Sequence, residues 1–159
     1  MVRILVVHGP NLNLLGQRQP GIYGTARLED INGRLQAWAA EHGVAIQIEQ
    51  TNHEGVMIDL LQQSMGRADG VVINPGGYAH TSVALADAVR ALAVPTVEVH
   101  LTNIFARDPI RRTSVVAEAC TAVIAGLGGE GYVAACAALV EMAISGKAVT
   151  SGPQWTGGV

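Results

Sequence analysis

Histidine, asparagine and glutamate side chains stand at the ends of three apolar segments that have the length of β-strands. These side chains are His8, Asn11, Asn74, His80, Glu98 and His100. In an open α/β sheet the ligand site lies at the carboxyl ends of the strands, so we expect most of them to meet at one edge. Histidine transfers protons near neutral pH, and an asparagine amide can hold a substrate or a water. The spacing therefore predicts a site for acid–base chemistry.

Each histidine also has a purely structural interpretation. His8 could bond only backbone groups at its strand end, His80 could serve only in capping the next helix, and His100 could be a hydrogen-bonded core residue. His42 and His53 are expected on the surface or in turns. No pair of histidines has metal-ligand spacing with a carboxylate partner, so we expect no metal.

Residues 11–24 make a longer connection than is usual between a strand and the next helix, and loops of this length are usually functional. Gly16 and Gly24 predict the hinges of a lid. Tyr23 could act as a base if its pKa fell below the usual value of about 10. Arg18 is the cation available to favour the phenolate. The alternative is an aromatic plug beside a solvent-facing arginine.

The elements that would position these side chains alternate along the chain. Apolar runs predict strands at residues 3–7, 44–49, 70–73, 95–100 and 121–125, and helical periodicity predicts helices at residues 28–42, 54–65, 81–92 and 130–144. Strands separated by helices favour an α/β fold of the flavodoxin-like type. We expect a five-stranded parallel sheet in the order 2-1-3-4-5 with helices on both faces. Residues 1–145 are expected to form one catalytic domain, and residues 146–159 a loose tail.

Composition restricts the partners of the 159-residue chain. Apolar residues make up 49% and charged residues only 14%, which indicates that much of the outer surface is buried in a homo-oligomer. A net charge of −3 argues against nucleic acid or an anionic membrane as the main partner. The first strand leaves no room for a signal peptide, and the longest apolar stretch, residues 132–144, is too short to span a bilayer. We therefore expect a cytoplasmic protein.

Several familiar chemistries do not fit the sequence. Residues 126–131 match GxGxxG, but no strand with an acidic end follows, so these glycines are expected to let the last helix pack closely. Lys147 is the only lysine and lies in the terminal segment, which makes a Schiff-base mechanism improbable. Cys120 and Cys136 lie in apolar stretches and are expected to be buried thiols.

Six segments together closely resemble the type II 3-dehydroquinases, which are the 3-dehydroquinate dehydratases of the shikimate and quinate pathways. The segments are GPNLNLLGQRQPGIYG, QTNHEG, INPGGYAHTSVALADAV, EVHLTN, ARDPIRR and GLGGEGY. The resemblance runs from Ile4 to Leu139. It implies dehydration of 3-dehydroquinate to 3-dehydroshikimate by anti elimination through an enolate, without a cofactor. It also implies a homododecamer built from four trimers.

By this resemblance, Tyr23 is the base and Arg18 lowers its pKa. Asn11 holds the water that stabilises the enolate, and His100, oriented by Glu98, protonates the leaving hydroxyl. The residues implied in substrate binding are Asn74, His80 and Arg111 for the hydroxyl groups, the amides of Leu101 and Thr102 for the carboxylate, and Asp87 toward a neighbouring subunit's site.

The chain departs from the family pattern without losing a catalytic group. His8 stands where asparagine is common, and Gln19, Ala79 and Ala86 also differ, which affects the expected lid and subunit contacts. A flavodoxin-like signalling or flavin-binding module is the rival class. It fits less well, because the strand ends lack the aspartates of a receiver domain and the first loop lacks a hydroxyl-rich phosphate site.

Overall fold

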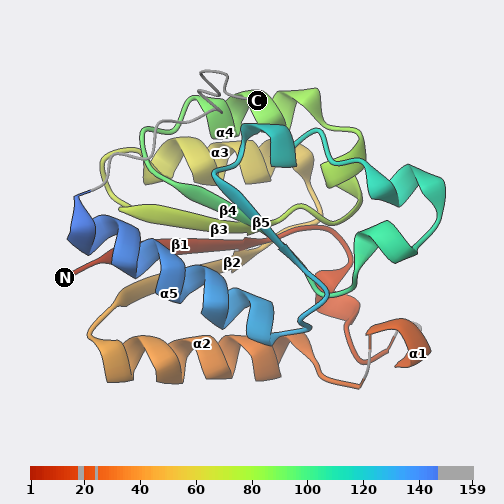
Figure 1. Ribbon diagram of the computed structural model, residues 1–159, viewed down its shortest axis with the longest axis horizontal. Coiled ribbons are helices and arrows are strands. Elements are labelled where there is room, and N and C mark those ends of the chain that lie inside the picture. The colour runs from red at the N-terminus through yellow and green to blue at the C-terminus, as the bar shows by residue number, and fades with distance from the viewer. Residues whose placement is uncertain (18–19, 24, 147–159) are drawn as a thin grey trace, which may run out of the picture.

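The computed structural model describes residues 1–17, 20–23 and 25–146, with the backbone alone at residues 20 and 23. Five parallel strands form one sheet in the order β2-β1-β3-β4-β5, which confirms the predicted fold class (Figure 1). The strands are β1 (Arg3–His8), β2 (Ala45–Gln50), β3 (Gly70–Asn74), β4 (Thr96–His100) and β5 (Ala122–Ala125). The strand order reverses between β1 and β3, which is where an open α/β sheet binds its ligand.

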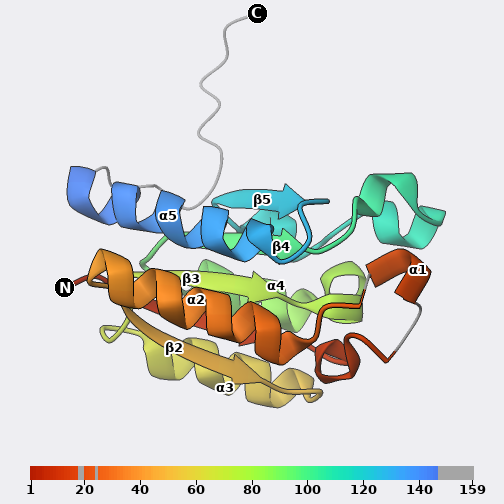
Figure 2. The same ribbon diagram turned by 90° about the horizontal axis from the view of Figure 1, so that it is seen from below.

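Helices cover both faces of the sheet (Figures 1 and 2). They are α2 (Leu28–His42) and α5 (Glu130–Ser145) on one face, and α3 (Glu54–Ser64) and α4 (Val83–Arg90) on the other. Each face has its own buried apolar cluster, and β1 contributes to both. Because side chains alternate along a strand, Ile4 and Val6 join one cluster while Leu5 and Val7 join the other. A strand buried on both faces therefore reads as a continuous apolar run.

Local backbone geometry sets the helix ends. The helix α2 stops at Gly43 as predicted, and the φ of 65° there is a left-handed conformation that glycine adopts readily. The helix predicted for residues 81–92 is shorter, because Ser82 Oγ accepts a hydrogen bond from the Leu85 amide and caps α4 at Val83.

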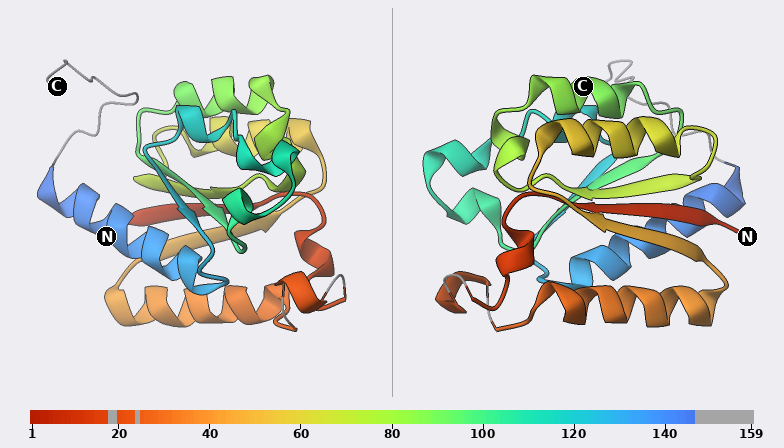
Figure 3. Two further views of the ribbon diagram at one scale, coloured as in Figure 1. Left: turned by 45° about the vertical axis from the view of Figure 1, so that its right-hand side comes forward. Right: turned by 180° about the vertical axis from the view of Figure 1, so that it is seen from behind.

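The connections between the strands and the longer helices contain short helices that the sequence did not predict. They are η1 (Leu12–Leu14), α1 (Pro20–Tyr23), η2 (Gly76–His80), η3 (Ile104–Ala106), η4 (Pro109–Arg112) and η5 (Ala117–Ala119). The helix α1 and the segment that carries η3 and η4 project from the same edge of the sheet (Figure 3). Of the helices in the described ranges, none is both long and apolar enough to cross a membrane.

Two glycines permit close approaches, which a side chain would prevent at Gly9 and crowd at Gly129. The Gly9 amide donates to the Asn74 carbonyl at 2.7 Å, and a Cβ on Gly9 would lie 2.7 Å from that oxygen. A Cβ on Gly129 would lie 3.0 Å from Ile31 Cγ1, so this glycine lets α5 pack against α2, as expected for the 126–131 segment.

Candidate active site

A cavity opens at the carboxyl edge of the sheet, between the loops that follow β1, β3 and β4. The expected site residues that line it are Asn11, Asn74, His80, His100, Leu101, Thr102 and Arg111. They come from three separate stretches of sequence, and the parallel sheet brings them together because it ends all of its strands at one edge. Glu98 lies directly behind this lining, fully buried in β4.

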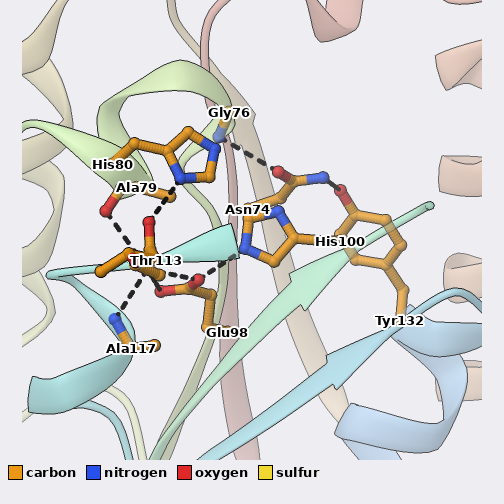
Figure 4. A network of polar contacts seen from close by, with 10 residues as sticks. Asn74, Gly76, Ala79, His80, Glu98, His100, Thr113, Ala117 and Tyr132 are labelled. Atoms are coloured by element: carbon orange, nitrogen blue, oxygen red, sulfur yellow. Dashed lines mark hydrogen bonds and ion pairs between the residues drawn. The ribbon is translucent and has the colours of Figure 1, made fainter. Parts of the chain in front are cut away.

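His100 is held from behind by a buried carboxylate (Figure 4). Its Nε2 lies 2.5 Å from Glu98 Oε1, and the two side chains are 7% and 0% exposed. A carboxylate accepts hydrogen bonds, so Nε2 carries a proton and donates it. The bond fixes the ring plane and leaves Nδ1 as the nitrogen that can serve a ligand in the cavity. His100 is therefore a hydrogen-bonded residue at a cavity wall, rather than a core histidine without access to ligand.

Ser114 completes this arrangement, and sequence reasoning did not single it out. Its Oγ lies 2.8 Å from Glu98 Oε1 and donates to that carboxylate, while the Ala117 amide donates to Ser114 Oγ at 3.0 Å. Bonds from both sides hold Glu98 in place. A serine in a polar stretch gives no sign of such a role, because the role depends on a contact between residues 16 positions apart.

His80 faces His100 across the cavity. The two rings lie nearly parallel, with centroids 6.3 Å apart. His80 Nδ1 donates to the Thr113 carbonyl at 2.7 Å, which turns Nε2 away from that bond and toward a ligand. His80 does not cap α4, since Ser82 does so.

The two asparagines are fixed in different ways. Asn11 has a φ of 68°, the one left-handed non-glycine backbone among the described residues, and asparagine tolerates this region better than most residues. The backbone amide of Asn11 donates to Asn52 Oδ1 at 3.0 Å, which leaves the Asn11 side chain at the cavity. Asn74 is 3% exposed, and its side-chain Oδ1 accepts from the Gly76 amide at 3.1 Å.

Two arginines line the cavity. Arg111 lines it and pairs with Asp108 at 3.2 Å, and Arg107, which sequence reasoning had not selected, lines it as well. The described residues that line the cavity include no aspartate or glutamate. The guanidinium groups of Arg107 and Arg111 favour an anionic ligand in this cavity.

Asp87 is not among the residues that line this cavity. Asp87 lies exposed on α4 and pairs with Arg90 at 2.9 Å. Arg18 lies outside the described residues, and of Tyr23 only the backbone, at the end of α1, is described. The expected hinge at Gly24, the departure at Gln19 and all but the first residue of the expected tail also lie outside them.

His8 does not line the cavity. Its ring also does not bond backbone groups alone, as the structural interpretation of the sequence had allowed. It is fully buried behind Asn74, and its ring nitrogens bond two side chains: Nδ1 lies 2.9 Å from Tyr132 Oη and Nε2 lies 2.9 Å from Asn32 Oδ1. Burial lowers the pKa of His8 from 6.5 to about 4. The ring is therefore neutral at physiological pH.

The fold and the cavity define an α/β protein that holds acid–base side chains at the carboxyl edge of a flavodoxin-like sheet. The chain belongs to the class II dehydroquinase family, because the family model described as "Dehydroquinase class II" matches residues 2–140.

Relatives with similar sequences carry one name. The chain is 51% identical over 134 residues to a 3-dehydroquinate dehydratase of Roseiflexus castenholzii, covering 84% of this chain and 85% of the relative. It is 51% identical over 136 residues to 3-dehydroquinate dehydratase 1 of Agrobacterium fabrum, covering 86% and 94%.

Solved structures agree with the sequence relatives. The crystal structure of a type II dehydroquinase from Butyrivibrio crossotus superposes with a TM-score of 0.86 at 37% identity, covering 87% of this chain and 97% of that one. That from Propionibacterium acnes gives a TM-score of 0.83 at 41% identity, covering 91% and 97%.

Proposed function

We propose that the protein is a hydro-lyase that dehydrates 3-dehydroquinate to 3-dehydroshikimate by anti elimination through an enolate, without a cofactor. The observation that carries the proposal is the His100–Glu98 pair at the wall of a cavity that also holds Asn11, Asn74 and His80. The family membership of the chain and the names of its relatives support the same activity.

The reaction needs a base at the carbon beside the ketone and an acid at the departing hydroxyl. The base takes the α-proton, and the electrons of the broken C–H bond form the enolate. The enolate then collapses to the ketone, the β C–O bond breaks, and the hydroxyl leaves with a proton as water. We assign the acid to His100, through Nδ1, because its Nε2 is already committed to Glu98.

The base assigned by the proposal is Tyr23, with Arg18 favouring its phenolate. The end of α1, which carries Tyr23, projects from the same edge of the sheet that carries the cavity (Figure 3). The tyrosine would take the α-proton, and the arginine would supply the positive charge that keeps the phenol ionised.

The enolate oxygen requires a hydrogen-bond donor where negative charge develops. Asn11 is assigned to hold the water that provides it, since its backbone is tied to Asn52 and its side chain lines the cavity. A donor fixed before the reaction needs no reorganisation as the enolate forms.

The substrate carries a carboxylate and several hydroxyl groups, and the cavity offers partners for both. Asn74, His80 and Arg111 are assigned to the hydroxyls, and the amides of Leu101 and Thr102 to the carboxylate. The arginines that line the cavity favour an anion over a neutral analogue of the same shape.

The proposal includes a homododecamer of four trimers, in which Asp87 reaches the site of a neighbouring subunit. Large apolar side chains on the surface of one chain support an oligomer: Val83, Phe105 and Ile110 are 62%, 60% and 67% exposed. Sedimentation should give the mass of twelve chains, and a monomer at micromolar concentration would contradict the assembly.

The activity is tested by adding 3-dehydroquinate and following the ultraviolet absorbance of the conjugated enone. Tyr23→Phe should abolish both turnover and exchange of the α-proton with deuterium, because the ring stays and only the accepting oxygen is lost. No absorbance change with the wild-type protein would refute the activity, while exchange at the wild-type rate in Tyr23→Phe would refute Tyr23 as the base.

A further inference from the structure

A chain of buried hydrogen bonds lies behind the cavity wall, opposite the side on which substrate would bind. Asn74 Nδ2 donates to Tyr132 Oη at 2.9 Å, His8 Nδ1 lies 2.9 Å from the same oxygen, and His8 Nε2 lies 2.9 Å from Asn32 Oδ1. Tyr132 and His8 are both 0% exposed. This chain of hydrogen bonds joins β3, α5, β1 and α2. Of its residues, the reaction assigned above uses only Asn74.

One backbone group determines the direction of every bond in this chain. The Gly76 amide can only donate, so it selects Oδ1 of Asn74 and leaves Nδ2 facing Tyr132 (Figure 4). Tyr132 Oη accepts a hydrogen bond from Asn74 Nδ2 and donates one to His8 Nδ1. His8 then carries its proton on Nε2 and donates it to Asn32.

The reverse orientation of the Asn74 amide is disfavoured at Gly76. It would set Nδ2 against the Gly76 amide, so that two donors faced each other. A buried polar group left without a partner costs about 1–3 kcal/mol. The chain therefore holds one orientation of the amide.

We propose that Tyr132 and His8 are positioning residues that hold the Asn74 amide in the orientation selected by the Gly76 amide, so that its second Nδ2 proton is presented to the hydroxyl group of the bound substrate. The proposal rests on the proposed function, in which Asn74 binds a substrate hydroxyl. An amide already oriented loses no rotational freedom on binding, which strengthens the substrate complex. Tyr132 and His8 touch no substrate and act only through Asn74.

Both positioning side chains are uncharged near neutral pH, as the chain requires. Burial lowers the pKa of His8 to about 4, and burial raises the pKa of Tyr132 above its ordinary value. The polar side chains that bond the His8 ring are Tyr132 from α5 and Asn32 from α2, and both are neutral. The unprotonated His8 Nδ1 can therefore accept a hydrogen bond from the Tyr132 hydroxyl.

The test is a double-mutant cycle between Tyr132→Phe and Asn74→Ala, read as kcat and KM for 3-dehydroquinate. Tyr132→Phe should raise KM about tenfold and change kcat less, since it releases a substrate-binding amide. In the Asn74→Ala background the same substitution should change KM less than twofold, because nothing remains to be positioned. Equal factors in the two backgrounds would overturn the proposal.

A matched control separates positioning from a loss of packing. Cys136→Ala removes a fully buried side chain one turn further along α5 that makes no bond in this chain. It should lower stability while leaving KM near the wild-type value. A KM rise in Cys136→Ala equal to that in Tyr132→Phe would show that helix packing, rather than the hydroxyl, sets substrate binding.

A second measurement needs no variant of Tyr132 to fold and no activity. Solid-state ¹⁵N NMR of the protein labelled at histidine should show His8 as the neutral tautomer protonated at Nε2, with His8→Gln used to assign the signal. A proton on Nδ1 would overturn the proposal even in an active enzyme. A wild-type protein that shows the Nε2 tautomer but does not dehydrate 3-dehydroquinate would refute the proposed function. It would thereby also refute the role of these hydrogen bonds in substrate binding.

Discussion

His8 and His100 end two strands of the same sheet, at the same edge, yet their surroundings differ in kind. His100 bonds a buried carboxylate and lines the cavity, whereas His8 bonds a phenol and an amide and is closed off from the cavity. A histidine at a strand end is therefore not by itself a proton-transfer group. The partner of the ring decides whether it exchanges protons with a ligand or holds a neighbour in place.

The largest expected effect separates the two histidines by their part in turnover. His100→Ala should lower kcat about 10²–10⁴-fold, because the proposed general acid is lost. Exchange of the α-proton with deuterium should continue, since the base remains. His8→Asn should lower kcat less than tenfold. Dehydration and deuterium incorporation are measured together by NMR, and equal losses of kcat in the two variants would break the comparison.

The next effect is the pH dependence of stability that buried His8 imposes. Its folded pKa of about 4 lies below the ordinary 6.5. As the pH falls below 6.5, the unfolded chain binds a proton that the folded protein does not, so stability decreases until about pH 4. The decrease from this one group is about 2 kcal/mol at pH 5.

Replacing His8 removes this titration and should flatten the curve. Between pH 7 and pH 5 the free energy of unfolding of the wild-type protein should therefore fall by about 2 kcal/mol more than that of His8→Asn. Urea unfolding at fixed protein concentration measures it. A difference that is constant across this range would mean that His8 titrates normally and is not shielded.

The smallest of the three effects concerns Ser114, which holds the carboxylate behind His100. Ser114→Ala removes the hydroxyl that donates to Glu98 at 2.8 Å and should lower kcat about tenfold, because the carboxylate loses one of its fixed bonds. Ser145→Ala is the matched control, since that exposed serine bonds the nearby Met142 carbonyl and lies at the far end of α5. An unchanged kcat in Ser114→Ala would show that Glu98 orients His100 without the hydrogen bond from Ser114.

The sequence predicted the sheet and the polar strand ends that line the cavity, because both follow from local pattern. The apolar run at β1 and the glycine after α2 are signals within a few residues, and the strand order follows from the alternation of strands and helices. Once the order is known, the side chains at the strand ends must share an edge. This is why Asn74, His80 and His100 could be placed together beforehand.

The supporting contacts could not be predicted in this way. Tyr132 lies 124 residues from His8 and 58 from Asn74, and its hydroxyl meets both only after α5 packs on the sheet. In the sequence it is one more apolar member of the last helix. Ser114 was missed for the same reason, since its partner Glu98 belongs to another element.

The missing side chain of Gly9 has a consequence for the evolution of this pocket. The backbones after β1 and β3 meet there at 2.7 Å, and even one methyl group would overlap the Asn74 carbonyl and drive the two loops apart. Gly9 is therefore closed to substitution, and variation in substrate preference is expected at other residues that line the cavity. A search of random variants for altered specificity should recover changes near Arg107 and Arg111 and none at Gly9.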